Sequence, residues 1–259
     1  MCPAENRPAH LEPSELGTKD WDKLYTNEIS NHAADPSDVG TVWFDDSDAE
    51  AKMVDFLCDL ADADADADAG SGALTKPATS LLDLGCGNGS LLFALRDEDW
   101  TGRALGVDYS PQSVALARQV AASKDSTADA VEFREWDIIG GPTDAVLDGA
   151  QRGGWDVVLD KGTFDAISLS DEHDAHGRRP CEGYRARVLR LVRRGGLFLV
   201  TSCNWTEEEL TTWFAHGGER PSAAGEDGGL EVAGRVQYRT FSFGGAKGQT
   251  ISTMCFKKI

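Results

Sequence analysis

The stretch Ser80-Leu-Leu-Asp-Leu-Gly-Cys-Gly-Asn-Gly89 decides the fold, because a short apolar run ends in an acid and glycines then occupy alternate positions. This pattern is typical of a strand that runs into a nucleotide-binding turn. Glycine adopts backbone angles that other residues avoid, so the chain can turn tightly and a ligand can approach the main chain. The glycines are Gly85, Gly87 and Gly89. A helix expected over residues 90–96 directs its positive N-terminal end toward that ligand.

The spacing of the turn indicates what kind of ligand it takes. The dinucleotide fingerprint is G-x-G-x-x-G, whereas this chain has D-x-G-x-G-x-G with Asp83 at the end of the strand. A carboxylate there repels a pyrophosphate and favours a cationic or zwitterionic ligand. Cys86 lies inside the turn, where we expect a small residue that fits rather than a nucleophile. Taken alone, the turn leaves a plain strand-to-helix connection as the less favoured alternative.

Two more strands end in acids further along the chain. The run Leu105-Gly-Val-Asp108-Tyr109 lies about one βαβ unit beyond the glycines, where an acid can hold both hydroxyls of a ribose. A third apolar strand ends in Asp137-Ile138, a pair suited to the edge and face of an adenine. Consecutive strand ends share one edge of a parallel sheet, which is where open α/β sheets bind ligands. The three acids therefore predict one nucleotide-like ligand on a single rim.

The order of the elements predicts an α/β fold with a Rossmann-like, seven-stranded and mostly parallel sheet. Strands are expected at 80–85, 103–108, 131–136, 156–161 and 197–202, and helices at 91–95, 111–123, 143–148 and 183–192. Such alternation places helices on both faces of the sheet. Two runs at 235–243 and 250–257 indicate a C-terminal antiparallel hairpin, one strand of which completes the sheet.

The chain is expected to form a single domain over residues 15–259, preceded by a flexible tail at 1–14. Within 15–60, Trp21, Leu24, Tyr25 and Ile29 recur at helical spacing, which indicates a helix that either packs on the edge of the sheet or covers the ligand. Residues 61–78 contain an alternating Ala-Asp run, which we interpret as a low-complexity acidic linker.

These motifs resemble those of the class I, seven-stranded methyltransferases that use S-adenosylmethionine. The stretch Asp83 to Gly89 looks like their first motif, Asp108 their ribose-binding acid and Asp137-Ile138 their adenine-side pair. Residues 155–167 and 195–206, with 16–28 and 39–44, resemble the protein-lysine methyltransferases that modify translation elongation factor 1-alpha. The resemblance covers roughly 14–60 and 78–259; Asp45-Asp46 and the insertions at 61–78 and 217–233 depart from it.

The resemblance implies S-adenosylmethionine as the cofactor and a lysine of elongation factor 1-alpha as the acceptor. In that family the N-terminal segment, with Trp43, covers the cofactor. Combined with the strand-end pattern, it marks these candidate cofactor-binding residues: Trp21, Tyr25, Trp43, Asp83, Gly85, Cys86, Gly87, Gly89, Asp108, Tyr109, Asp137, Ile138 and Asp160. The alternatives are a small-molecule methyltransferase and a non-catalytic binding module that keeps the cofactor fold.

Methyl transfer to an amine requires the neutral form of a lysine whose pKa is ordinarily near 10.4. Asp160, at the end of the fourth strand, is the candidate catalytic residue that orients the ammonium and helps its proton leave. The alternative reading of Asp160 is a residue that caps the helix expected after it. Asn204, after the fifth strand, is a second catalytic candidate that could shape the acceptor channel or simply form a turn.

Composition narrows the class of partner. Lys and Arg number 25 against 44 Asp and Glu, for a formal charge of −19, which argues against a nucleic-acid partner and favours a basic protein. No apolar stretch reaches the roughly 18 residues that a membrane span needs, and the amino terminus has no apolar signal segment. The 6 cysteines are scattered singly, without metal-ligand spacing. We expect a monomer without a metal, located in the cytoplasm, with the nucleus as a second location.

Overall fold

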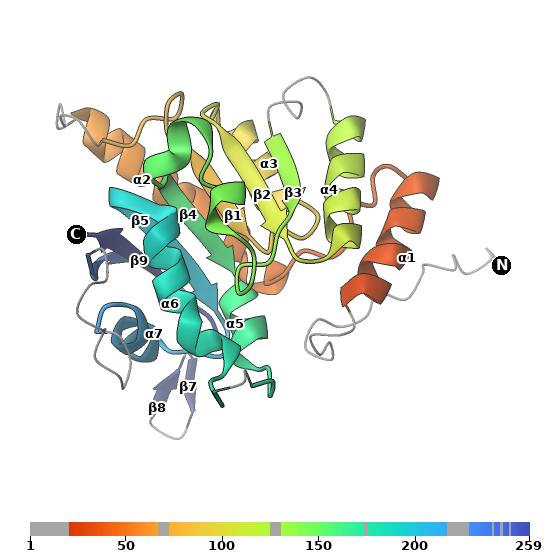
Figure 1. Cartoon of the computed structure of the whole chain (residues 1–259). Coiled ribbons are helices and arrows are strands. Elements are labelled where there is room, and N and C mark those ends of the chain that lie inside the picture. The colour runs from red at the N-terminus through yellow and green to blue at the C-terminus, as the bar shows by residue number, and fades with distance from the viewer. Residues whose placement is uncertain are drawn as a thin grey trace.

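A seven-stranded sheet in the order β3-β2-β1-β4-β5-β9-β6 forms the centre of the molecule (Figure 1). Its strands are β1 (Leu81–Leu84), β2 (Ala104–Asp108), β3 (Val131–Glu135), β4 (Trp155–Lys161), β5 (Val192–Ser202), β6 (Leu230–Arg235) and β9 (Ser252–Lys258). The computed structural model describes residues 21–66, 73–124, 131–173, 176–216, 228–239, 241–243, 246–248 and 250–259. The expected tail at 1–14 and part of both insertions lie outside the described residues.

Strand direction and register bring the acidic strand ends to one edge of the sheet. β1 pairs in parallel with both β2 and β4, so that Leu84 lies opposite Val107 on one side and Asp160 on the other. β9 pairs antiparallel with β5 and with β6, and is thus the strand of this sheet that runs against the rest. These findings confirm a mostly parallel sheet that an antiparallel C-terminal strand completes.

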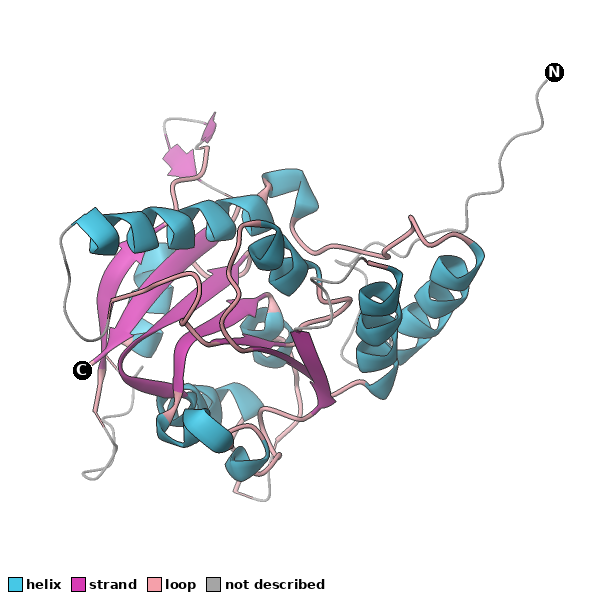
Figure 2. Ribbon diagram, turned by 90° about the horizontal axis from the view of Figure 1, so that it is seen from above, coloured by secondary structure: helices cyan, strands magenta, loops and turns pink. Residues whose placement is uncertain are grey.

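Helices cover both faces of the sheet (Figure 2). They are α1 (Trp21–Ala34), α2 (Ala49–Asp66), α3 (Ser90–Asp97), α4 (Pro111–Ser123), α5 (Thr163–Ser168), α6 (Pro180–Leu191) and α7 (Glu207–Phe214). Successive residues of a strand point to opposite faces. Leu81 accordingly packs in the core with α1 to α4, whereas Leu82 packs in the other core with α5 to α7. This alternation later decides which strand-end acids reach the ligand site.

Two segments differ from the sequence-based expectations in their helical content. α2 continues through the first half of the Ala-Asp run to Asp66, and Ala61 is buried in the core. Alanine has the highest helix propensity, so the run extends a helix already nucleated by packing rather than starting a linker at residue 61. The helix expected at 143–148 is only a 3-10 turn (Thr143–Ala145), and Gly149, with φ 52°, follows shortly after it.

The C-terminal part of the sheet also differs in its boundaries. β6 ends at Arg235, where the first strand of the expected hairpin was to begin. The segment between β6 and β9 contains a separate two-stranded sheet, β7 (Phe241–Phe243) with β8 (Ala246–Gly248). β5 begins at Val192 directly after α6, so Gly195-Gly196 lies within the strand and does not cap the helix.

Candidate cofactor and active site

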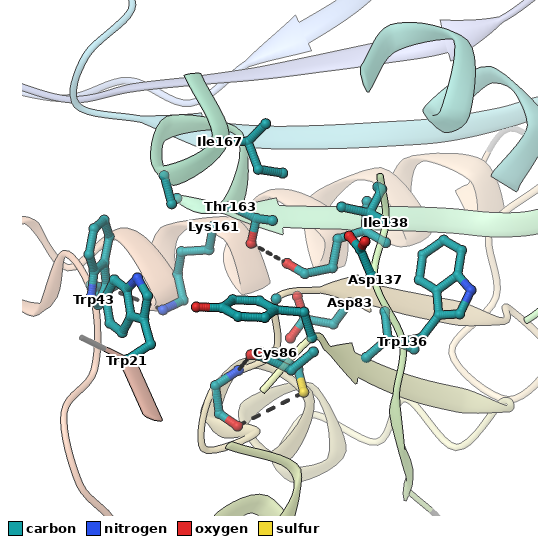
Figure 3. Close-up of a pocket in the computed structure, with 18 of the residues that line it drawn as sticks. Trp21, Trp43, Asp83, Cys86, Trp136, Asp137, Ile138, Lys161, Thr163 and Ile167 are labelled. Carbon is teal, nitrogen blue, oxygen red and sulfur yellow. Dashed lines mark hydrogen bonds between the residues drawn. The ribbon is translucent and has the colours of Figure 1, made fainter. Parts of the chain in front are cut away.

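A cavity lies at the carboxyl edge of the sheet, beside the ends of β1, β2 and β4 (Figure 3). Figure 3 shows Trp21 and Trp43 together at one end of the cavity and Trp136 at the other, with Asp83 and Lys161 between them. Most of the residues expected to bind the ligand line this cavity: Trp21, Tyr25, Trp43, Asp83, Gly85, Cys86, Gly87, Asp108, Tyr109, Asp137 and Ile138. Three expected residues, Gly89, Asp160 and Asn204, do not.

The glycine turn forms the floor of the cavity. Gly87 has φ 54°, and a Cβ built on it would meet only the Tyr25 hydroxyl oxygen, at 3.1 Å. This main chain is therefore open toward the cavity, as a ligand that passes directly over it requires. Gly85, with φ 66°, is needed for a different reason, because a Cβ there would lie 2.0 Å from the hydroxyl oxygen of Thr163. That hydroxyl donates to the Leu84 carbonyl at 2.6 Å and joins α5 to the turn.

Asp108 braces the glycine turn from the end of β2. Its carboxylate accepts hydrogen bonds from the Gly87 amide at 3.1 Å, the Ser110 amide at 2.9 Å and the Ser113 hydroxyl at 2.8 Å. Burial raises the pKa of Asp108, while these donors act in the opposite direction. The side chain lines the cavity, so a carboxylate held by several donors is presented to the ligand with a defined orientation.

Asp83 places a second carboxylate in the cavity. Its side chain is buried, and burial raises its pKa well above the usual value; the nearby Lys161 acts in the opposite direction. Lys161 ends β4, and its ammonium nitrogen lies 3.6 Å from a carboxylate oxygen of Glu50 in α2. Burial also raises the pKa of the Cys86 thiol well above its usual value. A protonated thiol is a poor nucleophile, which supports the interpretation of Cys86 as a small packing residue.

Asp137 and Ile138 form the side of the cavity that follows β3. The Asp137 carboxylate accepts from the amides of Ile139 at 2.8 Å and Gly140 at 3.0 Å, which shapes the turn. Ile138 is buried, and its carbonyl accepts from the Arg187 guanidinium at 2.6 Å. An exposed acid beside a buried apolar side chain can receive the polar edge and the face of a flat heterocycle.

The N-terminal segment both packs on the sheet edge and covers the cavity. α1 lies beside α4 (Figure 1), and its Trp21 ring lies 5.2 Å from the ring of Trp43 between their centroids. The Trp43 ring covers Gly162, where a Cβ would lie 2.7 Å from it. The Asn88 side chain donates to the Val39 carbonyl at 2.8 Å and ties this segment to the glycine turn.

Comparisons with known proteins identify the class of the site. A family model described as a methyltransferase domain matches residues 75–233. The chain is 38% identical over 251 residues to the protein-lysine N-methyltransferase EFM4 of Saccharomyces cerevisiae, which covers 96% of this chain and 97% of the yeast protein. It is 30% identical to EEF1A lysine methyltransferase 2 of Homo sapiens, across 95% of this chain and 88% of the human protein.

The chain belongs to the S-adenosylmethionine-dependent protein-lysine methyltransferases. Solved structures agree on the fold. The N-methyltransferase NodS from Bradyrhizobium japonicum, in complex with S-adenosyl-L-homocysteine, superposes with a TM-score of 0.51 at 14% identity, across 92% of this chain and 98% of that chain. These findings confirm the predicted family, the fold class and the cofactor.

The cavity of this methyltransferase fits S-adenosylmethionine in its donors and its charge. Gly87 presents open main chain, and Asp108 can accept from two adjacent ribose hydroxyls. Within the described residues, the buried indole nitrogen of Trp43 has no hydrogen-bond partner, so the cavity wall retains a donor for a ligand. The carboxylates of Asp83, Asp108 and Asp137 suit a ligand with cationic groups. When bound, the cofactor supplies an electrophilic methyl group.

The structure corrects the expected role of Asp160. Its side chain is fully buried and lies outside the cavity lining, because neighbouring Lys161 takes the cavity side of β4 and Asp160 takes the opposite face. Its carboxylate accepts from the amides of Thr163 at 2.8 Å and Phe164 at 3.1 Å, and from the Tyr184 hydroxyl. Burial raises its pKa to about 7. Asp160 therefore caps α5, which is the alternative interpretation of this residue, and its side chain does not line the cavity.

Gly89 and Asn204 also lie outside the cavity. A Cβ on Gly89 would lie 2.7 Å from the Phe133 ring, so this glycine permits α3 to pack against β3 and does not form the ligand floor. Asn204 is exposed, and its main-chain amide donates to the Ser202 hydroxyl at 3.1 Å within the turn after β5. The contacts of Asn204 are thus those of a residue in a turn, which is the alternative to a catalytic role.

Several residues that line the cavity were not among the candidates: Thr41, Asn88, Trp136, Ile139, Lys161, Thr163 and Ile167. Most of them could not be identified from the sequence, because they are ordinary residue types that belong to turns or to α5 and to no recognised motif. Lys161 is the exception. Strand alternation after Asp83 and Leu84 places Leu159 and Lys161 on the face of Asp83, and this register could have identified the lysine.

Proposed function

We propose that this methyltransferase modifies a lysine side chain of translation elongation factor 1A. The observation that carries the proposal is the near full-length similarity to relatives from two kingdoms of eukaryotes, one of which is named for EEF1A lysine methylation. The similarity includes the N-terminal segment that covers the cavity, and not only the cofactor-binding half of the chain.

The cavity supplies what methyl transfer to an amine needs. The reaction is an in-line displacement, and most of its acceleration comes from alignment of donor and acceptor with water excluded. Trp21, Trp43 and Trp136 provide apolar walls that exclude water, while Asp83 and Asp108 orient the cofactor. Among the described residues that line the cavity there is no histidine, and the carboxylate of Asp160 points elsewhere. We infer that the acceptor lysine loses its proton to water, so that the rate rises with pH toward the lysine pKa as more of the amine becomes neutral.

The proposal includes a basic protein partner, no nucleic-acid partner, and action as a monomer in the cytoplasm. The formal charge of −19 supports the first two, because nucleic-acid binding depends on cations that neutralise phosphates. In the part of the chain that the structure describes, no helix has the length and apolar character to cross a bilayer. Light scattering on the purified protein should give a mass near 27.8 kDa if it is a monomer.

The direct test is incubation of the purified protein with recombinant elongation factor 1A and S-adenosylmethionine labelled in the methyl group, followed by peptide mass spectrometry. We expect label on a lysine of the elongation factor, and none with the Gly87→Val variant. A parallel reaction with a cell lysate decides between acceptors: label on another protein replaces the proposed substrate, and label only in the small-molecule fraction supports the alternative enzyme class. No transfer by a protein that binds the cofactor supports a non-catalytic module.

A further inference from the structure

Lys161 has a position in the cavity that neither the motifs nor the comparisons assign to a role. It is the last residue of β4, and only 11% of its side chain is exposed. Among the described residues that line the cavity it is the only cation, and the carboxylates of Asp83, Asp108 and Asp137 line the same space. A buried ammonium without specific partners would be costly, so its contacts show what it holds.

The ammonium of Lys161 joins three parts of the structure. It donates to the main-chain carbonyl of Trp43 at 3.2 Å (Figure 3) and lies 3.6 Å from Glu50, whose side chain is itself only 19% exposed. The same oxygen of Glu50 accepts from the Ser90 hydroxyl at 2.6 Å, at the start of α3 directly after the glycine turn. Lys161 thus connects β4, the covering segment and the glycine turn through one charged group.

The residue after Lys161 acts on the same segment. The ring of Trp43 rests on Gly162, where any side chain would collide with it. Lys161 therefore holds the main chain of Trp43 through a hydrogen bond, and Gly162 leaves the space in which the Trp43 ring packs. Since the Trp43 and Trp21 rings are neighbours at one end of the cavity, Lys161 and Gly162 help to position both rings there.

We propose that Lys161 is a cofactor-positioning residue, which holds the Trp43 segment over the cavity and supplies the positive charge that Asp83 and Glu50 share. Without it, the buried carboxyl group of Asp83 and the partly buried carboxylate of Glu50 would repel each other without the nearby cation that offsets this repulsion. Asp83 would then retain its proton to higher pH and would attract the cationic cofactor less strongly. The charge of Lys161, and not only its bulk, is what the site requires.

The test compares three variants by calorimetric titration with S-adenosylmethionine, which needs no protein substrate and so stands apart from the proposed acceptor. Lys161→Met keeps the length of the side chain and removes its charge, and it should weaken binding by about tenfold or more, as for loss of a charged hydrogen bond. Lys161→Arg keeps the charge and should bind within about threefold of wild type. Lys161→Met combined with Glu50→Gln removes both charges and should recover part of the lost affinity.

The pH dependence of binding separates a charge role from a structural one. The charged and titratable groups that act on Asp83 are Lys161 of β4, Glu50 of α2, Asp108 of β2 and the Cys86 thiol of the turn, together with Asp160, which acts from the opposite face of the sheet. With Lys161→Met, affinity should increase as pH rises from about 6 to about 9, because Asp83 must lose its proton to attract the ligand. Wild-type binding should change less over the same range.

Three results would overturn the proposal. The first is native affinity in Lys161→Met at neutral pH. The second is equal weakening in Lys161→Met and Lys161→Arg, which would show that shape matters and charge does not. The third is a Lys161→Met variant whose affinity does not depend on pH. Thermal unfolding of each variant shows whether it is folded at the temperature of titration. If Lys161→Met does not fold, the affinities of the single variants Lys161→Arg and Glu50→Gln are compared with that of wild type instead.

Discussion

Two aspartates at neighbouring strand ends, Asp83 and Asp160, lie on opposite faces of the sheet and have different surroundings. On the side of α1 to α4, Asp83 lines the cavity together with Lys161, so its carboxyl group is accessible to a ligand. On the side of α5 to α7, Asp160 is enclosed by two amides and a tyrosine hydroxyl, and its charge is used entirely within the protein. The face of the strand that an acid occupies therefore determines whether it lines the cavity or caps a helix.

A second buried acid, Asp165, also uses its hydrogen bonds to hold α5 in place. Asp165 of α5 is fully buried, accepts from the Ser202 hydroxyl, and accepts from the Cys203 amide at 2.8 Å. It thereby fastens α5 to the turn after β5. The cavity side is built to receive groups from outside, whereas the α5 side is internally satisfied and holds the cavity wall in place. Variants on the two sides should therefore affect different measurements.

The largest expected effect is that of Gly87→Val on the cavity side. The added side chain would enter the cavity at a backbone angle that valine rarely adopts, and should weaken cofactor binding by more than about 100-fold in calorimetry. Gly153→Val is the matched control, because a Cβ at that position meets no atom within 4 Å. Normal binding by Gly87→Val would mean that the turn is structural and the ligand lies elsewhere.

Removal of the Asp108 carboxylate should have the next largest effect. Asp108→Ala deletes the proposed ribose contact and the brace on Gly87, and should cost about 2–3 kcal/mol of cofactor binding, the scale of charged hydrogen bonds. Ser113→Ala removes one donor to the carboxylate but leaves the charge, and should cost clearly less. Equal losses in the two variants would show that Asp108 acts only through the shape of the turn.

On the opposite side, Asp160→Asn should change stability more than binding. The asparagine NH2 group carries one more hydrogen than the protonated carboxyl group and would meet the donors around this site, so we expect a loss of about 1–3 kcal/mol in the free energy of unfolding at pH 5, with cofactor affinity changed less than about threefold. Tyr184→Phe, which removes one of the donors, should lose less. Parallel loss of cofactor binding in a folded Asp160→Asn variant would place this acid in the cavity after all.

The pH dependence of that stability loss has a definite sign. Burial raises the pKa of Asp160 to about 7 in the folded protein, whereas the pKa of an aspartate in the unfolded chain is about 3.8. Between these values the folded state binds more protons than the unfolded chain, so the contribution of Asp160 to stability falls as pH rises. The stability difference between wild type and Asp160→Asn should therefore shrink from pH 4 to about pH 7 in denaturant titrations. A difference that grows over this window contradicts the raised pKa.

The smallest expected effect is that of Asn204→Ala. The side chain is exposed and lies outside the cavity lining, so cofactor affinity should stay within about twofold of wild type and stability within about 0.5 kcal/mol. Initial rates of methyl transfer to the protein acceptor test the catalytic interpretation of Asn204 more directly than cofactor affinity does. A large loss of rate with intact cofactor binding would show that the acceptor protein contacts this turn, as the catalytic interpretation of Asn204 requires.

Local patterns accounted for the parallel core and for most of the cavity. The glycines and the acids after β1 and β2 depend on spacing within a few residues, and strand ends of a parallel sheet must meet at one edge. The misplaced boundaries lie where tertiary packing competes with local preference. Ala61 continues a helix because its side chain is buried against the core, and the segment after Arg235 forms its own small sheet.

Glycine spacing and acids at consecutive strand ends were enough to predict a nucleotide-like ligand at one rim of the sheet, and the resemblance of these motifs to known methyltransferases implied the family and the cofactor. Which of those acids line the cavity depends on the packing of the folded chain. Asp160 and Lys161 are neighbours in the chain, yet one caps a helix inside the protein and the other lines the cavity. Their roles diverge because adjacent residues of a strand point to opposite faces, and the helices packed on each face determine whether a side chain meets protein or ligand.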